Sequence, residues 1–252
     1  MISKNTLKLL HKLEQKKHRH ELGLFVAEGP KVVADLLRHG FCPVTIIATG
    51  QWLTGQEQTI AAVPATTIIE ASPDELQRAS FLQHPQQVMA LFPIPPAVSP
   101  APQKGQLYLA LDGVQDPGNL GTIVRIADWF GINTIYCSED TVDVWSPKVI
   151  QATMGSIARV NVIYTSLTAL LSSTPLPVYG TLLDGHNIYQ RTLSADGIIV
   201  MGNEGNGISA AVRPLVSEKL LIPDYSTSTD KAESLNVAIA TAITCAEFRR
   251  RF

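Results

Sequence analysis

Residues 107–252 alternate continuous apolar segments with amphipathic ones, and this pattern strongly restricts the possible folds. The apolar segments predict strands at 107–114, 133–138, 160–164, 177–185, 197–202 and 219–223. The intervening segments predict helices at 119–131, 146–159, 208–217 and 234–251. Strands that are apolar on both faces are typical of parallel sheets covered by helices on each side. The pattern therefore predicts an α/β fold with a mainly parallel sheet.

The first 92 residues show a smaller version of the same alternation. A basic helix is expected over 1–21, with further helices at 30–39 and 72–81 and strands at 23–29, 44–49, 66–70 and 86–92. Five prolines follow within residues 91–105. Because proline removes backbone donors and favours extended chain, this stretch is expected to be a linker. The predicted division is a small α/β domain over 1–92, a linker over 93–106 and a larger domain over 107–252.

The composition suits soluble domains with sizeable cores, since the chain has 252 residues, of which 45% are hydrophobic. No apolar run approaches the roughly 20 residues that cross a bilayer, and the N-terminal segment lacks the apolar core of a secretory signal. Three widely spaced cysteines suggest neither a disulfide framework nor a zinc site. We therefore expect a cytoplasmic protein without a metal.

The positive charge is concentrated at the N-terminus. Residues 1–21 hold six Lys and Arg against two Glu, although the whole chain has a net charge of −2. Such a cluster can attract phosphate backbones, with Lys12, Lys16, Lys17 and Arg19 as candidate contacts. The alternative is a solvated amphipathic helix whose lysines only keep it soluble.

Three strand ends carry polar residues, and ligands of parallel sheets bind beyond the carboxyl ends of strands. The first segment is DGVQDPGNLGTIVRIADWFG, residues 112–131. Pro117 and Gly118 predict a turn, and Asn119 is a candidate N-cap. Arg125 is expected to point away from the buried stripe of the helix. The alternative is a surface arginine paired with a carboxylate.

The second segment is GIIVMGNEGNGIS, residues 197–209. Glycines at 202, 205 and 207 let the backbone approach a ligand closely. The segment matches neither the dinucleotide fingerprint nor the phosphate loop, and Glu204 would repel a pyrophosphate. A cationic or hydroxyl-rich ligand fits this loop better, and the alternative is a tight turn with an exposed Glu.

The third segment covers residues 222–248, with Glu233 and Ser234 before the last helix and Asn236 in its first turn. Ser234 is the expected N-cap. The spacing predicts a buried apolar face on this helix, formed by Leu235, Ile239, Ala242, Ile243 and Ala246.

Taken in order, these segments resemble the SpoU–TrmH family, the knotted SPOUT branch of RNA 2′-O-ribose methyltransferases. The first family motif matches Asn119, Gly121 and Arg125, the second Gly202 to Ser209, and the third Ile222-Pro223 with Ser234 to Val237. The resemblance spans 107–252. Residues 1–92, with Phe25, Glu28 and Gly29, resemble more loosely the ribosomal-protein-like substrate-binding domain often attached in this family.

The chain departs from the family pattern in two places. Eleven positions separate Pro223 from Ser234, where the family usually has about seven, and Ala238 stands where a second serine is common. The longer polar loop over 224–233 affects the part of the pocket expected to receive adenine.

The resemblance implies a C-terminal domain with a deep trefoil knot, S-adenosylmethionine as cofactor, and a homodimer with the active site at the subunit interface. The substrate would be rRNA or tRNA. The implied catalytic residues are Arg125, Asn119, Glu204, Ser234 and Asn236. The implied cofactor-binding residues are Thr181, Leu182, Gly202, Asn203, Gly205, Ile222, Pro223, Ser234 and Leu235.

Methyl transfer to a ribose 2′-hydroxyl is mainly a positioning task, and the family's catalytic residue is Arg125. Because a guanidinium deprotonates only above about pH 12, Arg125 is expected to bind phosphate and stabilise alkoxide charge rather than act as a base. One alternative is a non-catalytic RNA-binding or ribosome-assembly protein that retains the fold. Another is a nucleotide-binding α/β enzyme such as a dehydrogenase, which would lack its glycine fingerprint.

Overall fold

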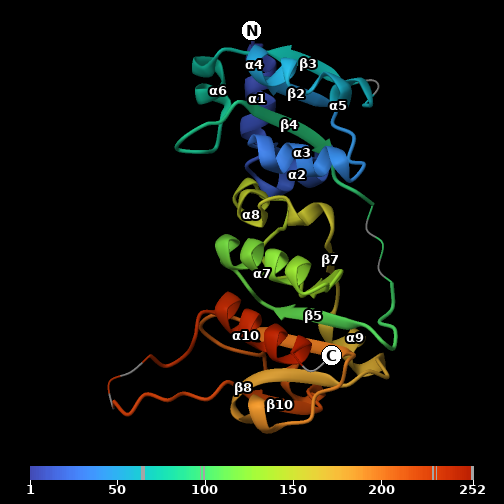
Figure 1. Ribbon diagram of the computed structural model, residues 1–252, viewed down its shortest axis with the longest axis vertical. Coiled ribbons are helices and arrows are strands. Elements are labelled where there is room, and N and C mark those ends of the chain that lie inside the picture. The colour runs from blue at the N-terminus through green and yellow to red at the C-terminus, as the bar shows by residue number, and fades with distance from the viewer. Residues whose placement is uncertain (64–65, 97, 99, 229, 231, 251–252) are drawn as a thin grey trace. The chain divides into compact units, whose positions relative to one another are not determined.

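A computed structural model describes residues 1–63, 66–96, 98, 100–228, 230 and 232–250. The chain divides into two compact units (Figure 1). The first unit comprises Met1–Pro96 and Asp143–Arg159, and the second comprises Ala97–Val142 and Val160–Phe252. Contacts thus group Asp143–Arg159 with the first unit, whereas the sequence-based division assigned this stretch to 107–252. Residues 97 and 99 of the proposed linker, and position 251 of the last expected helix, lie outside the described residues.

The first unit is built on a four-stranded mixed sheet in the order β1-β4-β2-β3. Its strands are β1 (Leu24–Glu28), β2 (Thr45–Ala48), β3 (Thr67–Glu70) and β4 (Val88–Pro93). Its helices are α1 (Lys4–Lys12), α2 (Lys16–Leu22), α3 (Pro30–Arg38), α4 (Gly50–Thr54), α5 (Glu57–Ala61), α6 (Pro73–Ala79) and α8 (Pro147–Thr153). Buried leucines of α1 and α6 pack on Val26, Ile47 and Met89 and form one core cluster.

The single basic helix expected over 1–21 is wrong, because the chain turns between α1 and α2. The guanidinium of Arg19 donates hydrogen bonds to the carbonyl oxygens of Leu13 and Glu14, at 2.8 and 2.7 Å. It thereby satisfies carbonyl groups at the turn, where the helix leaves them without partners.

The helix expected over 146–159 is also shorter than predicted. α8 ends at Thr153, because Met154 and Gly155 have left-handed backbone angles, with φ of 50° and 94°. A 3-10 helix at Ser156–Ala158 follows. Trp145, just before α8, lies against Phe25 of β1 with ring centroids 4.6 Å apart, so this segment contributes to the core of the first unit.

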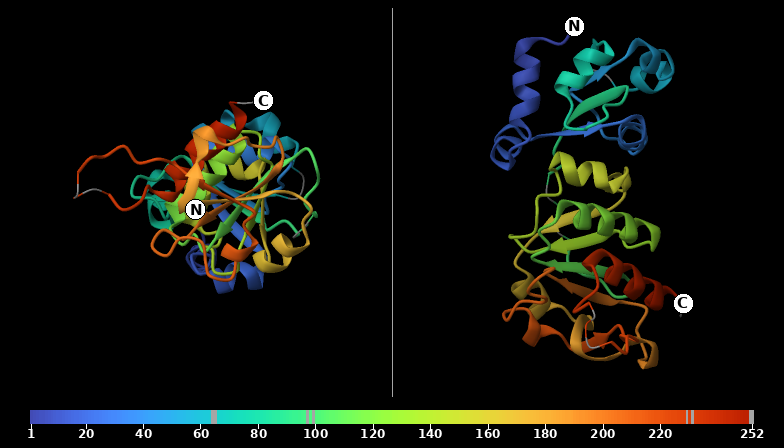
Figure 2. Two further views of the ribbon diagram at one scale, coloured as in Figure 1. Left: turned by 90° about the horizontal axis from the view of Figure 1, so that it is seen from below. Right: turned by 90° about the vertical axis from the view of Figure 1, so that its left-hand side faces the viewer.

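The second unit contains a six-stranded sheet in the order β10-β8-β9-β5-β6-β7, with every pair parallel (Figures 1 and 2). Its strands are β5 (Leu107–Asp112), β6 (Thr134–Cys137), β7 (Asn161–Tyr164), β8 (Val178–Asn187), β9 (Gly197–Gly202) and β10 (Glu218–Leu221). Its helices are α7 (Pro117–Trp129), α9 (Leu167–Ser173) and α10 (Val237–Arg249). The predicted α/β class with a parallel sheet is confirmed.

Side chains on both faces of this sheet are buried. Tyr108 and Val200 pack with α9 on one face. On the other face α10 packs against α7 and β9, and Phe248 meets Tyr179 with ring centroids 4.9 Å apart. Burial on both faces is the reason that these strands are apolar throughout.

Two sequence-based assignments in this unit fail. Residues 208–217 form only a 3-10 helix at Arg213–Leu215, since Pro214 lacks an N–H and the Ser209 N–H donates instead to Asp112 Oδ2 at 2.7 Å. Helix α9, capped by Ser166, was not predicted. Within the described part of the chain, no helix is long and apolar enough to span a membrane.

Candidate active site

The loops after β5 and β9 begin side by side, because Asp112 pairs with Gly202 in the sheet register. The loop after β10 leads to α10, which packs on α7. The three motifs found in the sequence therefore meet at one end of the second unit, as expected for the carboxyl ends of parallel strands.

Asn203 holds the glycine-rich loop in shape. Its backbone exchanges two hydrogen bonds of 2.9 Å with Gly207. Its side-chain oxygen accepts from the N–H groups of Gly205 and Asn206, both at 2.9 Å, and its Nδ2 donates to the Gly113 carbonyl at 2.7 Å. The side chain of Asn203 thus organises the loop.

Gly202 cannot carry a side chain in this loop. An added Cβ would lie 2.2 Å from the carbonyl carbon of Gly207 and 2.3 Å from the nitrogen of Ile208. Gly207 has a φ of 69°, which L-residues other than glycine rarely adopt. Close backbone packing therefore requires glycine at position 202, and the left-handed backbone requires it at position 207.

Glu204 reaches the N-terminus of α7. Its carboxylate accepts hydrogen bonds from the backbone N–H groups of Gln115 and Asp116, each at 3.3 Å, and from Asn119 Nδ2 at 2.9 Å. Partial burial by itself would raise the pKa of Glu204, but these hydrogen bonds outweigh it and hold the pKa below its ordinary value. Glu204 is therefore an ionised group that ties two loops together.

Asn119 and Asn236 extend this connection to the third loop. Asn236 Nδ2 donates to Asn119 Oδ1 at 2.9 Å, and its own Oδ1 accepts from the N–H groups of Ala238 and Ile239. One line of hydrogen bonds, Glu204–Asn119–Asn236, thus joins the three motifs.

Both helix caps predicted from the sequence are wrong. α7 is capped by Asp116, whose Oδ1 accepts from the Asn119 N–H at 2.8 Å, and α10 is capped by Asn236 rather than Ser234. Asn119 lies within the first turn of α7. Its side chain does not cap the helix and donates a hydrogen bond to Glu204 instead.

A cavity of about 600 Å³ lies beside the glycine-rich loop, a volume suited to a small-molecule cofactor. Eight of the nine predicted cofactor residues line it: Thr181, Leu182, Gly202, Asn203, Gly205, Ile222, Ser234 and Leu235. Pro223 does not line it. Positions 229 and 231 of the longer loop lie outside the described residues.

The sequence reasoning missed several lining residues, among them Asp184, Met201, Arg213 and Leu220. Asp184 forms ion pairs with Arg213 at 2.6 Å and with Lys219 at 2.9 Å, which hold its pKa at about 2. Asp184 could have been found from its position near the carboxyl end of β8, because β8 is the neighbour of β9 in the sheet.

The apolar face predicted for the last helix is wrong. Leu235 and Ile239 are 50% and 52% exposed, and α10 instead buries the face that holds Thr241, Thr244 and Phe248. Buried threonines are tolerated because their hydroxyls donate to the carbonyl oxygens four residues earlier.

Arg125 is exposed on α7, as predicted, and does not line the cavity. Its guanidinium makes no hydrogen bond or ion pair with any residue that the structure describes. Trp129, one turn further along α7, is 85% exposed.

Of the four RNA contacts predicted in the first unit, three are exposed and one is buried. Lys12, Lys16 and Lys17 are exposed on α1 and α2. Arg19 is 2% exposed and donates two hydrogen bonds to Asp143, at 2.9 and 2.6 Å. The prediction that Arg19 contacts RNA is therefore wrong, because its guanidinium is buried in an ion pair.

The model of the SpoU rRNA Methylase family matches residues 106–246. The chain belongs to this family. Residues 4–90 match the MRM3-like substrate binding domain. Both parts of the resemblance seen in the sequence are thus confirmed.

Similar proteins cover nearly the whole chain. A Bacillus subtilis protein named 23S rRNA (guanosine(2553)-2′-O)-methyltransferase RlmP is 30% identical, over 92% of this chain and 91% of its own length. The solved structure of a putative RNA methyltransferase of the TrmH family from Porphyromonas gingivalis is 38% identical with a TM-score of 0.87, and 100% of each chain is covered. An AdoMet-bound rRNA methyltransferase from Sinorhizobium meliloti is 30% identical with a TM-score of 0.88, covering 100% of this chain and 96% of the other.

Proposed function

We propose that the protein methylates a ribose 2′-hydroxyl of RNA, with S-adenosylmethionine as the methyl donor. The observation that carries this proposal is the cavity beside three loops joined by Glu204, Asn119 and Asn236, in a member of the SpoU family. The cofactor supplies, when bound, a methyl group already activated on a positively charged sulfur. The chain must then bind the adenosyl group, orient the ribose and stabilise charge on its oxygen.

The cavity fits the cofactor in size and in chemistry. Ile222 and Leu235 offer apolar surface and backbone groups to a neutral base, and Gly202 leaves the cavity wall without a side chain. Asp184 and Arg213 supply charged groups at another part of the lining. Residues of these kinds suit a ligand with a neutral nucleoside and a charged amino-acid end.

Arg125 is the group proposed to meet the RNA. Its permanent charge stabilises a developing alkoxide and contacts the neighbouring phosphate. Because it does not line the cavity of its own chain, we propose that two copies of the protein form the active site, with Arg125 of each copy serving the site that they share.

Exposed apolar side chains support a homodimer. Trp129 of α7 is 85% exposed, and Leu235 and Ile239 are each about half exposed. Because α7 packs against α10, these side chains belong to neighbouring elements. If this surface forms the interface, Trp129→Glu should convert a dimer to a monomer in sedimentation measurements. A wild-type protein that sediments as a monomer at all concentrations would contradict the proposal.

The knot of the family is also part of the proposal. The chain leaves β9, forms the glycine-rich loop, adds β10 at the edge of the sheet and returns in α10 to pack on β9 and α7. This path is compatible with threading of the C-terminal segment through an earlier loop.

The name of the Bacillus subtilis relative makes large-subunit rRNA the first substrate to test, with tRNA as the second. Purified protein with radiolabelled S-adenosylmethionine should label an rRNA transcript, and alkaline hydrolysis should leave the label in resistant dinucleotides. RNA binding without transfer to any rRNA or tRNA would instead favour the non-catalytic alternative.

A further inference from the structure

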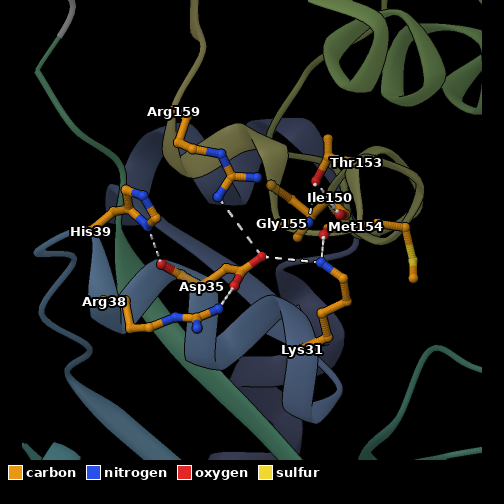
Figure 3. A network of polar contacts seen from close by, with 9 residues as sticks. All are labelled: Lys31, Asp35, Arg38, His39, Ile150, Thr153, Met154, Gly155 and Arg159. Atoms are coloured by element: carbon orange, nitrogen blue, oxygen red, sulfur yellow. Dashed lines mark hydrogen bonds and ion pairs between the residues drawn. The ribbon is translucent and has the colours of Figure 1, made fainter. Parts of the chain in front are cut away.

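Asp35, on α3 of the first unit, is a buried carboxylate approached by three cationic side chains (Figure 3). Its Oδ1 accepts a hydrogen bond from Arg38, and its Oδ2 lies 3.2 Å from Lys31 Nζ and 3.9 Å from Arg159 Nη1. The Asp35 side chain is 5% exposed, whereas those of Lys31 and Arg38 are 60% and 68% exposed. Lys31 and Arg38 are therefore held by a buried carboxylate while most of each side chain stays exposed to solvent.

The backbone of the segment after α8 completes this cluster. Lys31 Nζ also donates to the Met154 carbonyl at 3.0 Å. A Cβ at Gly155 would lie 2.4 Å from Asp35 Oδ2, so only glycine permits this close approach. The turn at these two residues leads to Arg159, which joins the cluster (Figure 3). The arrangement is thus fixed by packing.

The charges of this cluster do not balance. Burial alone would raise the pKa of Asp35, but hydrogen bonds from Arg38 and Lys31 outweigh it and lower the pKa, so the carboxylate is ionised at neutral pH. The one negative charge of Asp35 faces the two positive charges of Lys31 and Arg38 on the same helix, which leaves an excess of one positive charge on this side of α3.

The ion pair of Arg19 and Asp143 in the same unit is purely structural and differs from the Asp35 cluster in charge balance and exposure. It has one charge of each sign, and its side chains are only 3% and 6% exposed. The guanidinium also donates to two carbonyl oxygens, so its hydrogen-bonding capacity is largely used inside the protein. Among the described residues, Arg38 by contrast donates only to Asp35 and keeps most of its donors for a ligand.

We propose that Lys31 and Arg38 bind backbone phosphates of the RNA substrate, and that Asp35 positions these two cations. The inference rests on the proposed function, since RNA supplies the phosphates. The planar fork of Arg38 matches two phosphate oxygens, and the Lys31 ammonium adds a point charge two helical turns away.

The test is RNA affinity as a function of salt, with unfractionated transfer RNA as the probe of backbone binding. Wild-type protein and the Lys31→Gln/Arg38→Gln variant are titrated at about 50 mM and about 200 mM salt. Each lost phosphate contact lowers the slope of log affinity against log salt by about 1. The loss of affinity between the two salt concentrations should therefore be about tenfold smaller for the double variant.

The control is Arg78→Gln, which removes an exposed arginine of α6 in the same unit. It should leave more of the salt dependence than Arg38→Gln does. The charge-conserving variants Lys31→Arg and Arg38→Lys should retain the salt slope of wild type, because the charge that meets the phosphate is kept. A role limited to the fold of the first unit does not require this result. Superimposable titrations of the double variant and wild type, or an equal loss in Arg78→Gln, would overturn the inference.

Methyl transfer separates this inference from the proposed function. If wild type labels rRNA but the double variant binds transfer RNA as wild type does, only the phosphate cluster is wrong. If wild type transfers no methyl group while the double variant loses RNA affinity, the cluster stands and the catalytic assignment fails.

Discussion

Glu204 in the second unit and Asp35 in the first are both carboxylates whose pKa values are lowered, but by different partners. Neutral N–H donors from a helix terminus and an asparagine hold Glu204, and no cation among the described residues pairs with it. Lysine and arginine side chains hold Asp35. The first arrangement keeps a net negative charge beside the cavity, and the second leaves net positive charge at the surface.

This difference separates the tasks of the two units. A negative loop beside the cavity favours a sulfonium and repels free phosphate, whereas a positive cluster favours an RNA backbone. Glu204 is held by neutral donors and not by Arg125, which is exposed on α7, so the charge of Arg125 is available to a ligand.

The largest expected effect concerns this separated cation. Arg125→Ala should lower kcat for RNA methylation by about 10²–10³, as removal of an electrostatic donor to a developing charge typically does. Cofactor binding, measured by calorimetry with S-adenosylmethionine, should stay unchanged. A near-normal kcat would show that the charge of Arg125 is not used in catalysis.

Glu204→Gln tests whether the loop arrangement depends on the negative charge that accepts hydrogen bonds from Gln115, Asp116 and Asn119. The amide keeps the shape but accepts more weakly, and hydrogen bonds to charged groups are worth about 1.5–3 kcal/mol. Affinity for S-adenosylmethionine should fall by about 10- to 100-fold, as measured by calorimetry. The matched control is Glu233→Gln, a change at an exposed residue that lines the cavity and makes no side-chain hydrogen bond with any described residue. Equal effects of the two changes would contradict the role of the Glu204–Asn119–Asn236 connection.

Charge reversal of Lys12, Lys16 and Lys17 tests the positive charge of the first unit. These exposed lysines are expected to contact RNA, so their reversal should weaken affinity and its salt dependence while cofactor binding stays unchanged. Lys17 is 3.8 Å from Glu21, with both side chains largely exposed. Because the carboxylate that pairs with Lys17 is exposed, Lys17 should contribute less to RNA affinity than Arg38, which is held by the buried Asp35. Titrations at two salt concentrations that match wild type would exclude these lysines as RNA contacts.

The smallest effect is on stability in acid. Asp35 and Glu204 have folded-state pKa values below their unfolded values, so their contribution is present above the unfolded pKa and is lost as pH falls through the folded pKa. The buried Asp35 can change the unfolding free energy by at most about 1.4 kcal/mol per pH unit in that window, and the exposed Glu204 by less, because solvent screens its interactions. Asp35→Asn should flatten the dependence measured by chemical denaturation below about pH 4. Glu28, whose pKa burial raises, should contribute with the opposite sign.

Much of the site followed from local sequence. The residue types and spacing around Asn119, Gly202 and Ser234 identified the loops, and the apolar strands predicted that parallel strand ends would bring them together. The caps were misassigned because Asn, Asp and Ser all suit an N-cap, and each helix has two such residues near its start. The role of Asn119 could not be seen locally, since its side chain bonds Glu204, which lies 85 positions away. The buried face of α10 was misassigned because Thr241 and Thr244 satisfy their hydroxyls within the helix, which the apolar pattern does not reveal.

The sequence by itself determined the strands, the parallel sheet and the family, because alternation and motif spacing are properties of neighbouring residues. The tertiary structure decided that Arg19 is buried against a residue 124 positions away, that Asp143–Arg159 packs with the first unit, and that Asp35 gathers three cations. The physical reason is that the role of a charged side chain depends on its partners and its burial, and both are set by segments far apart in the chain.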